Sequence, residues 1–401
     1  MSKIDELIAQ YCPNGVEYKE LGELGIFYGG LSGKSKADFQ NGNAKFISYM
    51  NVYSNIAVKT NINDFVRIGE NENQNKVEYG DVLFTGSSET PDECGISSVL
   101  TEKISEPLYL NSFCFGFRLH DKALFLPDFL KYLFRDDKIR EQIAQTANGV
   151  TRFNVSKKRF AKLLIPVPPL PVQQEIVNIL DKFTELEAEL EAELEARRKQ
   201  YEYYRNRLLS ATEVNGKWLM NGVEVEWKTL TDIFKISRGR VMSKEYLSQN
   251  KGEYPVYSSQ TANNGQIGKI STYDYDGEYL TWTTDGANAG TIFYRNEQFS
   301  ITNVCGLLKA NTINVVPKFA YYVLSVVMKS YVSSGMGNPK LMSNVVAKIQ
   351  IPIPPLPVQQ EIVTILDTFT QLEAELEAEL EARKKQYEYY REKLLSFDRA
   401  E

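Results

Sequence analysis

The chain contains a long internal repeat, and this repeat limits the folds that are open to it. Residues 165–210 and 351–396 are segments of 46 residues that differ at only seven positions. A shorter repeat relates Asn14-Gly15-Val16-Glu17 to Asn221-Gly222-Val223-Glu224. Each long copy follows a block that is not repeated, so the chain consists of two tandem units. Its 401 residues are enough for two or three domains with cores of their own.

The repeated segment predicts a long helix that follows an extended stretch. Four prolines near its start, the last of them Pro171, exclude helix there. From Val172 to about Ser210 there is no glycine or proline, and strong helix formers dominate. About 39 helical residues make a rod of roughly 58 Å. Apolar residues recur every three or four positions and form one stripe suited to a partner helix.

Two copies of one helix in one chain can pair with each other. Antiparallel pairing gives a pseudo-twofold tandem repeat with one variable block at each end. A single Glu-rich helix is also typical of a solvated spacer or an ordinary coiled coil. The expected fold is α+β, with two globular mixed α/β domains joined by two long antiparallel helices that form a coiled-coil spacer.

The repeat divides the chain into six segments. The first is an N-terminal connector, residues 1–20, which we expect to pack with the C-terminal helix. The others are the first variable block 21–164, the first proline-helix segment 165–210, the connector 211–229, the second variable block 230–350 and the second proline-helix segment 351–401. Both blocks alternate short apolar runs with Gly, Asn and Ser turns, and each has a late helix, near 128–145 and 317–333.

Charge and cysteine content narrow the class of protein. The chain has 46 basic and 52 acidic residues, which excludes the strongly basic field of a ribosomal protein or histone. Acidic residues gather in the proline-helix segments, whereas both variable blocks are slightly basic. The four cysteines form no C-x-x-C pair, no apolar run approaches the ~20 residues of a membrane span, and the start is no targeting sequence. These features favour a reduced, cytoplasmic protein without a membrane segment.

No catalytic or metal-binding constellation is evident in the sequence. Gly29-Gly30-Leu31-Ser32-Gly33-Lys34-Ser35 lacks the first glycine of a phosphate-binding loop, since Tyr28 stands in its place. A flexible glycine loop that presents Lys34 and Lys36 to a DNA backbone explains it better. His120 is the only histidine, and clustered metal ligands are absent. We therefore expect neither a catalytic nor a metal site.

The proline-helix motif resembles a known family. Ile-Pro-Val-Pro-Pro-Leu-Pro-Val-Gln-Gln-Glu-Ile at 165–176, with its copy at 351–362, is similar to the motif of DNA specificity subunits of type I restriction-modification systems. The resemblance covers essentially the whole chain. It implies that each variable block is a target recognition domain that reads one half of a split double-stranded DNA sequence, and that the helices are the spacer.

The resemblance also implies the partners. Two methyltransferase subunits would dock on the spacer, and nuclease-translocase subunits would join for restriction. The chain itself would be non-catalytic and hold no cofactor, with S-adenosylmethionine, ATP and Mg on the partner subunits. The residues expected to bind a partner belong to the apolar stripe: Ile176, Leu180, Phe183, Ile362, Leu366 and Phe369.

The expected DNA contacts lie in the glycine loops, in the segments before the prolines and in two loops of the second block. They are Lys34, Lys36, Arg152, Asn154, Lys157, Arg238, Arg240, Lys244, Ser258, Ser259, Asn288, Asn338 and Lys340. The Thr-Pro frequent in the family's glycine loop is missing from both copies. Two other interpretations stay open: a coiled-coil scaffold that presents two modules for protein or carbohydrate ligands, and an enzyme with an unrecognised site. Of these interpretations, only DNA binding predicts that the logarithm of the affinity falls linearly with the logarithm of the salt concentration.

Overall fold

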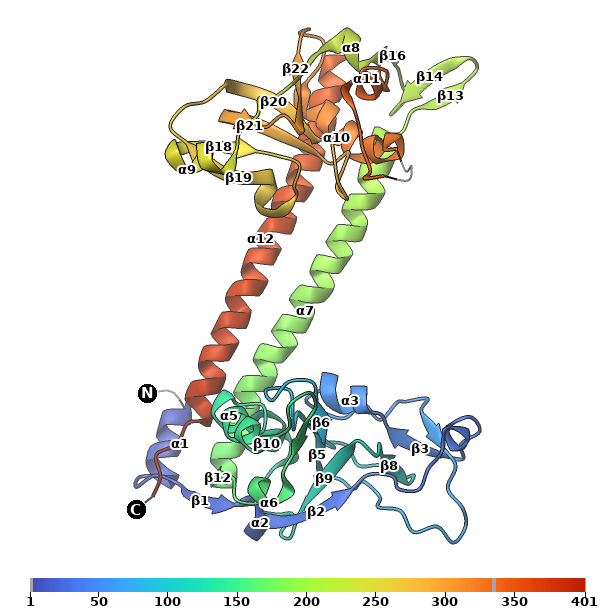
Figure 1. The fold of residues 1–401 in the computed structure, drawn as a ribbon. Coiled ribbons are helices and arrows are strands. Elements are labelled where there is room, and N and C mark those ends of the chain that lie inside the picture. Colours follow the sequence, from blue (N-terminus) through green and yellow to red (C-terminus); the bar gives the residue numbers. More distant parts are fainter. Residues whose placement is uncertain (1–2, 334–336, 401) are drawn as a thin grey trace. The chain divides into compact units, whose positions relative to one another are not determined.

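The computed structural model describes residues 3–333 and 337–400, and the chain forms two compact units. Unit 1 comprises Met1–Glu191 and Glu379–Glu401, and unit 2 comprises Ala192–Ala378. Residues 1–2, 334–336 and 401 of the expected segments lie outside the described residues. The two long helices begin in one unit and end in the other, and each unit is described by itself (Figure 1).

Unit 1 contains the first variable block. Its elements are α1 Lys3–Tyr11, β1 Glu17–Glu20, α2 Leu21–Leu24, β2 Gly25–Gly29, η1 Lys36–Phe39, β3 Ala44–Ile47, α3 Tyr49–Ser54, β4 Phe65–Val66, β5 Val82–Thr85, β6 Ser87–Ser88, β7 Ser97–Val99, β8 Leu108–Leu110, β9 Cys114–Leu119, α4 Pro127–Leu133, α5 Asp137–Gln145, β10 Ala147–Asn148, β11 Phe153–Val155, α6 Lys157–Phe160, β12 Leu164–Val167 and the first part of α7 Leu170–Leu209.

Four small sheets organise unit 1. The strand orders are β2-β9-β5-β7, β4-β3-β8, β10-β11-β6 and β1-β12. Phenylalanines of β5, β9 and α6 pack edge to face in the main core, which continues onto the start of α7 through Val172, Ile176 and Leu180. The variable block is therefore fixed to the repeated helix by a shared core.

Unit 2 contains the second variable block. Its elements are β13 Thr212–Val214, β14 Lys217–Met220, β15 Val223–Glu224, β16 Glu226–Thr229, α8 Leu230–Ile233, β17 Phe234–Arg238, α9 Lys244–Gln249, β18 Lys251–Tyr257, η2 Ala262–Gly265, β19 Gln266–Ile270, β20 Tyr275–Thr283, β21 Ile292–Ile301, β22 Cys305–Ala310, α10 Pro317–Val327, η3 Met328–Tyr331, α11 Ser343–Val346, β23 Gln350–Ile353 and the first part of α12 Leu356–Leu395.

The main sheet of unit 2 repeats the strand arrangement of unit 1 with one difference. This sheet has six strands in the order β17-β22-β20-β21-β18-β19. Strand β21 is continuous over ten residues and pairs with both β20 and β18. In unit 1 the equivalent strands β7 and β8 are separate, so the sheet is divided in two. The α+β fold class is confirmed.

The long helices begin slightly earlier than the prolines suggest. Helix α7 spans Leu170–Leu209 and α12 spans Leu356–Leu395, so Pro171 lies in the first turn. A proline is tolerated there because the first amides of a helix have no intrahelical acceptor. Pro166 lies in β12, which pairs with β1. The approach to the helix is thus a short strand.

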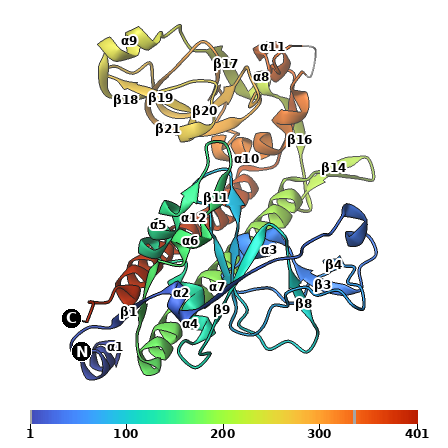
Figure 2. The ribbon, with the colours of Figure 1, turned by 60° about the horizontal axis from the view of Figure 1, so that its bottom comes forward.

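The helices pair in antiparallel fashion inside each unit. In unit 1, the ring of Phe183 stacks on that of Tyr390 with centroids 5.4 Å apart. In unit 2, Phe369 stacks on Tyr204 at 5.5 Å. Figures 1 and 2 show the two helices side by side within each unit. The predicted antiparallel pairing of the two copies is confirmed at these contacts.

The late helices are shorter than expected. In unit 1 the segment 128–145 forms α4 and α5, which are separated at Asp136, because its carboxylate caps α5 by accepting from the Lys138 amide at 3.1 Å. In unit 2 the α-helix ends at Val327 and continues as the short 3₁₀ helix η3. The N-terminal connector contacts the last residues of the chain: the Val16 amide donates to the Asp398 carbonyl oxygen at 2.8 Å.

Candidate nucleic-acid interface

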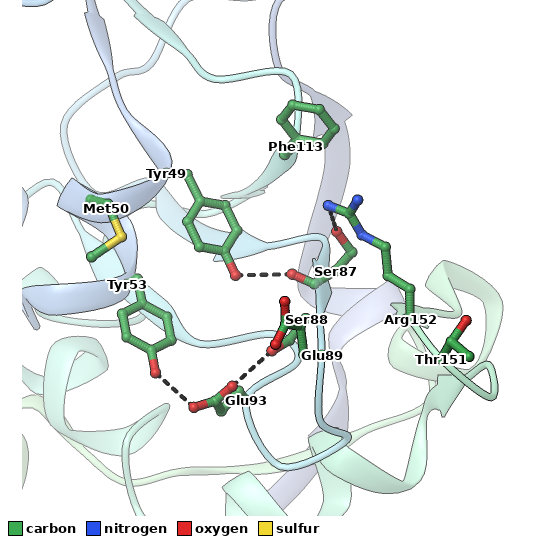
Figure 3. A pocket seen from close by; sticks show the side chains of 10 residues that line it. All are labelled: Tyr49, Met50, Tyr53, Ser87, Ser88, Glu89, Glu93, Phe113, Thr151 and Arg152. Atoms are coloured by element: carbon green, nitrogen blue, oxygen red, sulfur yellow. Dashed lines mark hydrogen bonds between the residues drawn. The ribbon is translucent and has the colours of Figure 1, made fainter. Parts of the chain in front are cut away.

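In unit 1, two loops and a short helix surround a pocket of about 490 Å³. One loop follows β5 and carries β6, the other lies between β10 and β11, and the helix is α3. The loops are joined because Ser87 pairs with Asn154 and Ser88 with Phe153. Figure 3 shows the side chains that line the pocket: Tyr49, Met50, Tyr53, Ser87, Ser88, Glu89, Glu93, Phe113, Thr151 and Arg152.

Arg152 reaches the pocket from the turn between β10 and β11 (Figure 3). Its Nη2 donates to Ser87 Oγ at 3.2 Å, and its guanidinium carbon lies 5.6 Å from the ring centroid of Phe113. Phe113 itself is 58% exposed. Gly149 has a φ of +146°, and a Cβ there would lie 2.0 Å from the Arg152 carbonyl oxygen. The turn that presents Arg152 therefore requires glycine at this position.

Glu93 supplies a negative charge to the same pocket. Tyr49 and Tyr53 are four residues apart on α3, so their rings stack, with centroids 6.1 Å apart. The hydroxyls of Tyr53 and Ser88 donate to the Glu93 carboxylate at 2.9 and 3.0 Å. These hydrogen bonds, that of Tyr53 foremost, lower the pKa of Glu93. The pocket thus holds a guanidinium and an ionised carboxylate on an aromatic lining.

Unit 2 builds the same loop framework from a different sequence. At the end of β5, the Thr85 carbonyl and hydroxyl accept from the amides of residues 95 and 96 at 3.0 and 2.9 Å. At the end of β20, Thr283 accepts in the same way from the amides of residues 290 and 291, at 2.9 and 3.0 Å. The loop that follows each threonine therefore begins with the same pair of hydrogen bonds from backbone amides.

The backbone pairings that follow these threonines show which residues of unit 1 correspond to which residues of unit 2. Ser87 pairs with Asn154 in unit 1, and Asp285 forms the equivalent antiparallel bridge with Lys340 in unit 2. In unit 1 the carbonyl of the residue before Ser87 accepts a hydrogen bond from the Val155 amide at 3.1 Å. In unit 2 the carbonyl of the residue before Asp285 accepts one from the Leu341 amide at 2.9 Å. Arg152 of unit 1 therefore corresponds to Asn338 of unit 2, and the framework carries different side chains in the two units.

Asp285 joins two of the expected DNA contacts. Its Oδ2 lies 3.7 Å from Arg238 Nη2, and its Oδ1 lies 3.9 Å from Lys340 Nζ. The Thr284 hydroxyl also donates to Oδ2 at 2.5 Å. The three charged side chains are 33%, 32% and 54% exposed for Arg238, Asp285 and Lys340. The structure brings Arg238 and Lys340 together, through a carboxylate that was not among the expected contacts.

The glycines of the two glycine loops serve packing inside the chain. A Cβ at Gly30 would lie 2.0 Å from the Asn111 carbonyl oxygen, and a Cβ at Gly239 would lie 2.0 Å from the Ile301 carbonyl oxygen. Both glycines let the chain pass close to a neighbouring strand. Close approach to DNA is not needed to explain them.

Lys34 is held inside its loop. Its Nζ donates to the Arg67 carbonyl oxygen and pairs with the Glu72 carboxylate, both at 2.5 Å, and the side chain is only 8% exposed. A hydrogen bond from the Gly69 amide and that of Lys34 lower the pKa of Glu72 to about 2. The expectation that the loop offers Lys34 to DNA is therefore corrected, because this ammonium group stabilises the loop. Lys36 is exposed in η1.

The remaining expected DNA contacts fall into two groups. Asn154, Lys157, Lys244 and Asn338 are exposed, and Lys157 Nζ lies 5.6 Å from the Phe115 ring centroid. The other group is engaged within unit 2: Arg240 pairs with Asp274 at 2.9 Å, Ser258 accepts from Thr302 at 2.8 Å, Ser259 accepts from the Thr284 amide at 3.0 Å, and Asn288 donates to Thr261 at 3.1 Å. These bonds order the loops, and their DNA contacts stay predictions.

The apolar stripe residues are used inside the chain. Ile176, Leu180 and Leu366 are fully buried and Ile362 is 2% exposed, all in the cores of the two units. Phe183 and Phe369 stack on tyrosines of the paired helix. The expectation that Ile176, Leu180, Ile362 and Leu366 bind a partner subunit is corrected, since the cores of the two units cover them. Phe183 and Phe369 are only half-buried, and their contact with a partner stays a prediction.

Sequence reasoning did not find the pocket's aromatic and acidic residues. Tyr49, Tyr53, Glu93 and Phe113 meet Arg152 only because β6 pairs with β11. Among residues 3–333 and 337–400, no helix is long and apolar enough to cross a membrane, and no group of three metal-ligating side chains gathers.

A family model and several known proteins match the chain. The model of the type I restriction modification DNA specificity domain matches residues 13–196 and 222–382. The Mycoplasma pneumoniae type I specificity subunit S.MpnORF615P is 40% identical over 240 residues, which are 59% of this chain and 94% of that protein. The MpnII specificity subunit of the same organism is 38% identical over 205 residues, covering 50% of this chain and 62% of that protein.

Solved structures share the fold. The S subunit of a type I restriction-modification system from M. genitalium has a TM-score of 0.59 at 17% identity and covers 95% of this chain and 96% of its own. The HsdS subunit of Thermoanaerobacter tengcongensis has a TM-score of 0.52 at 17% identity, covering 96% and 97%. At these identities the likeness concerns the fold.

Proposed function

Because this chain belongs to the type I restriction-modification DNA specificity subunits, we propose that each of its units reads one half of a split double-stranded DNA target through the loop framework described above. In unit 1 this surface is the pocket around Arg152 and Glu93. In unit 2 it is the group of Arg238, Asp285 and Lys340.

One observation carries this proposal: equivalent positions hold different chemistry. Ser87 and Asn154 of unit 1 correspond to Asp285 and Lys340 of unit 2. Side chains of arginine, asparagine, aspartate and glutamate are those that distinguish base edges in the major groove. A shared framework with changed side chains supports two different half-sites. A scaffold for protein or carbohydrate ligands is not favoured, since the chain is a specificity subunit.

The proposed partners follow from the repeated surface. Each unit exposes the same three apolar positions of the repeat: Leu170, Leu186 and Tyr389 in unit 1, and Leu356, Leu372 and Tyr203 in unit 2. These exposures range from 40% to 61%. Apolar side chains presented twice fit two copies of one partner. We assign them to two methyltransferase subunits, one for each unit.

The chemistry is assigned to those partners. We propose that this chain is non-catalytic, that its methyltransferase subunits bring S-adenosylmethionine, and that nuclease-translocase subunits bring ATP and Mg. The proposed location is the cytoplasm, where the DNA ligand is. A chain that turned over a substrate without added subunits would contradict this assignment.

The test is methylation mapping with the chain and its own methyltransferase subunits expressed together. We expect a target of two short defined sequences separated by a fixed number of unspecified bases. Substitutions in the loops of unit 1 should change one half only, and those in unit 2 the other. An unsplit target, or one substitution that alters both halves, would overturn the proposal. Native mass spectrometry should find two methyltransferase subunits for each chain, and a single one would contradict the partner assignment.

A further inference from the structure

We propose that Arg152 reads a guanine in the half-site of unit 1, and that Glu93 accepts a hydrogen bond from the exocyclic amino group of a second base in that half-site. This inference rests on the proposed function and names two residues that set its specificity. It concerns the pocket shown in Figure 3.

The guanidinium of Arg152 is oriented before any ligand arrives. Ser87 Oγ takes one of its five N–H donors, and its guanidinium carbon lies within cation–π distance of the Phe113 ring, 5.6 Å from the centroid. No carboxylate forms an ion pair with Arg152 in residues 3–333 and 337–400. Its remaining donors are thus free to meet two acceptors side by side. Guanine presents such a pair, N7 and O6, in the major groove.

The acidic side of the pocket argues against a phosphate as the ligand. Glu93 and Glu89 line the same pocket, and hydrogen bonds from Tyr53 and Ser88 keep Glu93 ionised. A phosphate placed there would be repelled by the carboxylates. Cytosine and adenine instead offer amino donors, which a fixed carboxylate accepts. A base edge therefore satisfies both charged groups, whereas a phosphate satisfies only Arg152.

The two units differ at this point, which makes the inference specific to unit 1. Asn338 occupies the position of Arg152, and two nearby cations of unit 2, Arg238 and Lys340, are already paired with Asp285. Replacement of Asn338 should therefore leave the first half-site unchanged. This residue is a matched control within the same chain.

The experiment uses the complex of the chain with its methyltransferase subunits and a duplex that contains the mapped target. 7-Deazaguanine at the inferred guanine removes the N7 acceptor and leaves base pairing intact. With the wild-type complex we expect binding to weaken by roughly 10- to 100-fold, because one hydrogen bond to a charged group is lost. Arg152→Ala should weaken binding by about 10- to 100-fold on normal DNA. Deazaguanine should then have no further effect.

Arg152→Lys tests the same point if the alanine variant fails to assemble. It keeps the charge but loses the planar fork, so it should keep non-specific affinity and lose the preference for guanine. Lys158→Ala, an exposed neighbour in α6, should weaken specific and non-specific binding alike. For Glu93, Glu93→Gln should relax the preference at a position other than the guanine.

Several results would overturn the inference while leaving the proposed function intact. A mapped first half-site without guanine is one. An Arg152→Ala complex that stays equally sensitive to deazaguanine, or that binds all sequences with the same loss, is another. Loss of preference at the guanine itself in Glu93→Gln would remove Glu93 from its assigned base. If the wild-type complex shows no sequence preference at all, the proposed function fails with it.

Discussion

Gln173 and Gln359, which occupy equivalent positions of the repeat, make the same three hydrogen bonds in their own units. Both are fully buried. The Gln173 amide nitrogen donates to the carbonyl oxygens of Pro168 at 2.7 Å and Leu124 at 3.0 Å, and its oxygen accepts from the Leu126 amide at 2.9 Å. Gln359 repeats this with Pro354, Asn314 and Val316, at 2.8, 2.9 and 2.8 Å. Each glutamine ties the start of a long helix to the loop before the late helix of its block.

Replacement of this glutamine should loosen one unit only. Gln173→Ala leaves the Leu126 amide and two carbonyl groups without their partner, and a buried unsatisfied group costs about 1–3 kcal/mol. We expect faster hydrogen exchange at the Leu126 amide and earlier unfolding of unit 1. Gln359→Ala should act on Val316 in unit 2 instead.

The neighbouring Gln174 is the control for this prediction. It is exposed, and its side chain bonds only to Asn178 among the contacts described. Gln174→Ala should change stability by no more than about 0.5 kcal/mol. Equal effects of the two alanine variants would show that the buried bonds of Gln173 contribute little.

The carboxylate of Asp285 should restrain non-specific DNA binding by unit 2. Asp285→Asn keeps the shape of the side chain but leaves Arg238 and Lys340 without their shared anion. We expect tighter binding to non-target DNA, a steeper salt dependence and poorer discrimination at the second half-site. Fluorescence anisotropy with target and non-target duplexes at several salt concentrations measures all three.

Charge removal elsewhere separates this effect from a change in net charge. Asp276 is an exposed carboxylate on β20, where it accepts from Gln298. Asp276→Asn removes the same charge and should leave discrimination at the second half-site unchanged. If both variants behave alike, Asp285 acts only through the overall charge.

The Lys34 loop should open in acid. Because the pKa of Glu72 falls from its ordinary 4.5 to about 2 in the folded chain, its bonds contribute their full stability above pH 4.5. That contribution is lost as the pH falls from 4.5 toward 2, since the carboxyl then takes up a proton. Hydrogen exchange at the Gly69 amide, corrected for its intrinsic pH dependence, should rise over this interval. Glu72→Gln should show raised exchange at this amide without that pH step. If the wild type and Glu72→Gln gave parallel pH profiles of exchange, Glu72 would not be the group whose protonation opens the loop.

The repeat made the helices predictable, whereas the pocket could not be predicted. A helix free of glycine and proline, copied within one chain, leads directly to the pairing seen at Phe183 and Tyr390. Its start at Leu170 differs from the expected one because a first-turn proline loses no hydrogen bond. The burial of Lys34 depends on Glu72, which no local pattern connects to it. Tertiary packing likewise buries most of the apolar stripe that was expected to contact a partner.

The long helices should set the number of unspecified bases between the two half-sites. Inserting one Leu-Glu-Ala-Glu unit after Glu189 adds about 6 Å to α7, and one base pair adds ~3.4 Å to DNA. The spacer in the target should therefore grow by one or two base pairs, while the half-site sequences stay the same because the loops of both units are untouched. A matched insertion after Glu375 of α12 should stabilise the lengthened helix pair. It restores the register in which Phe183 stacks on Tyr390 and Phe369 on Tyr204. Methylation mapping of the single and double insertions decides the matter. An unchanged spacer, or altered bases in either half-site, would show that the helices do not determine the spacing.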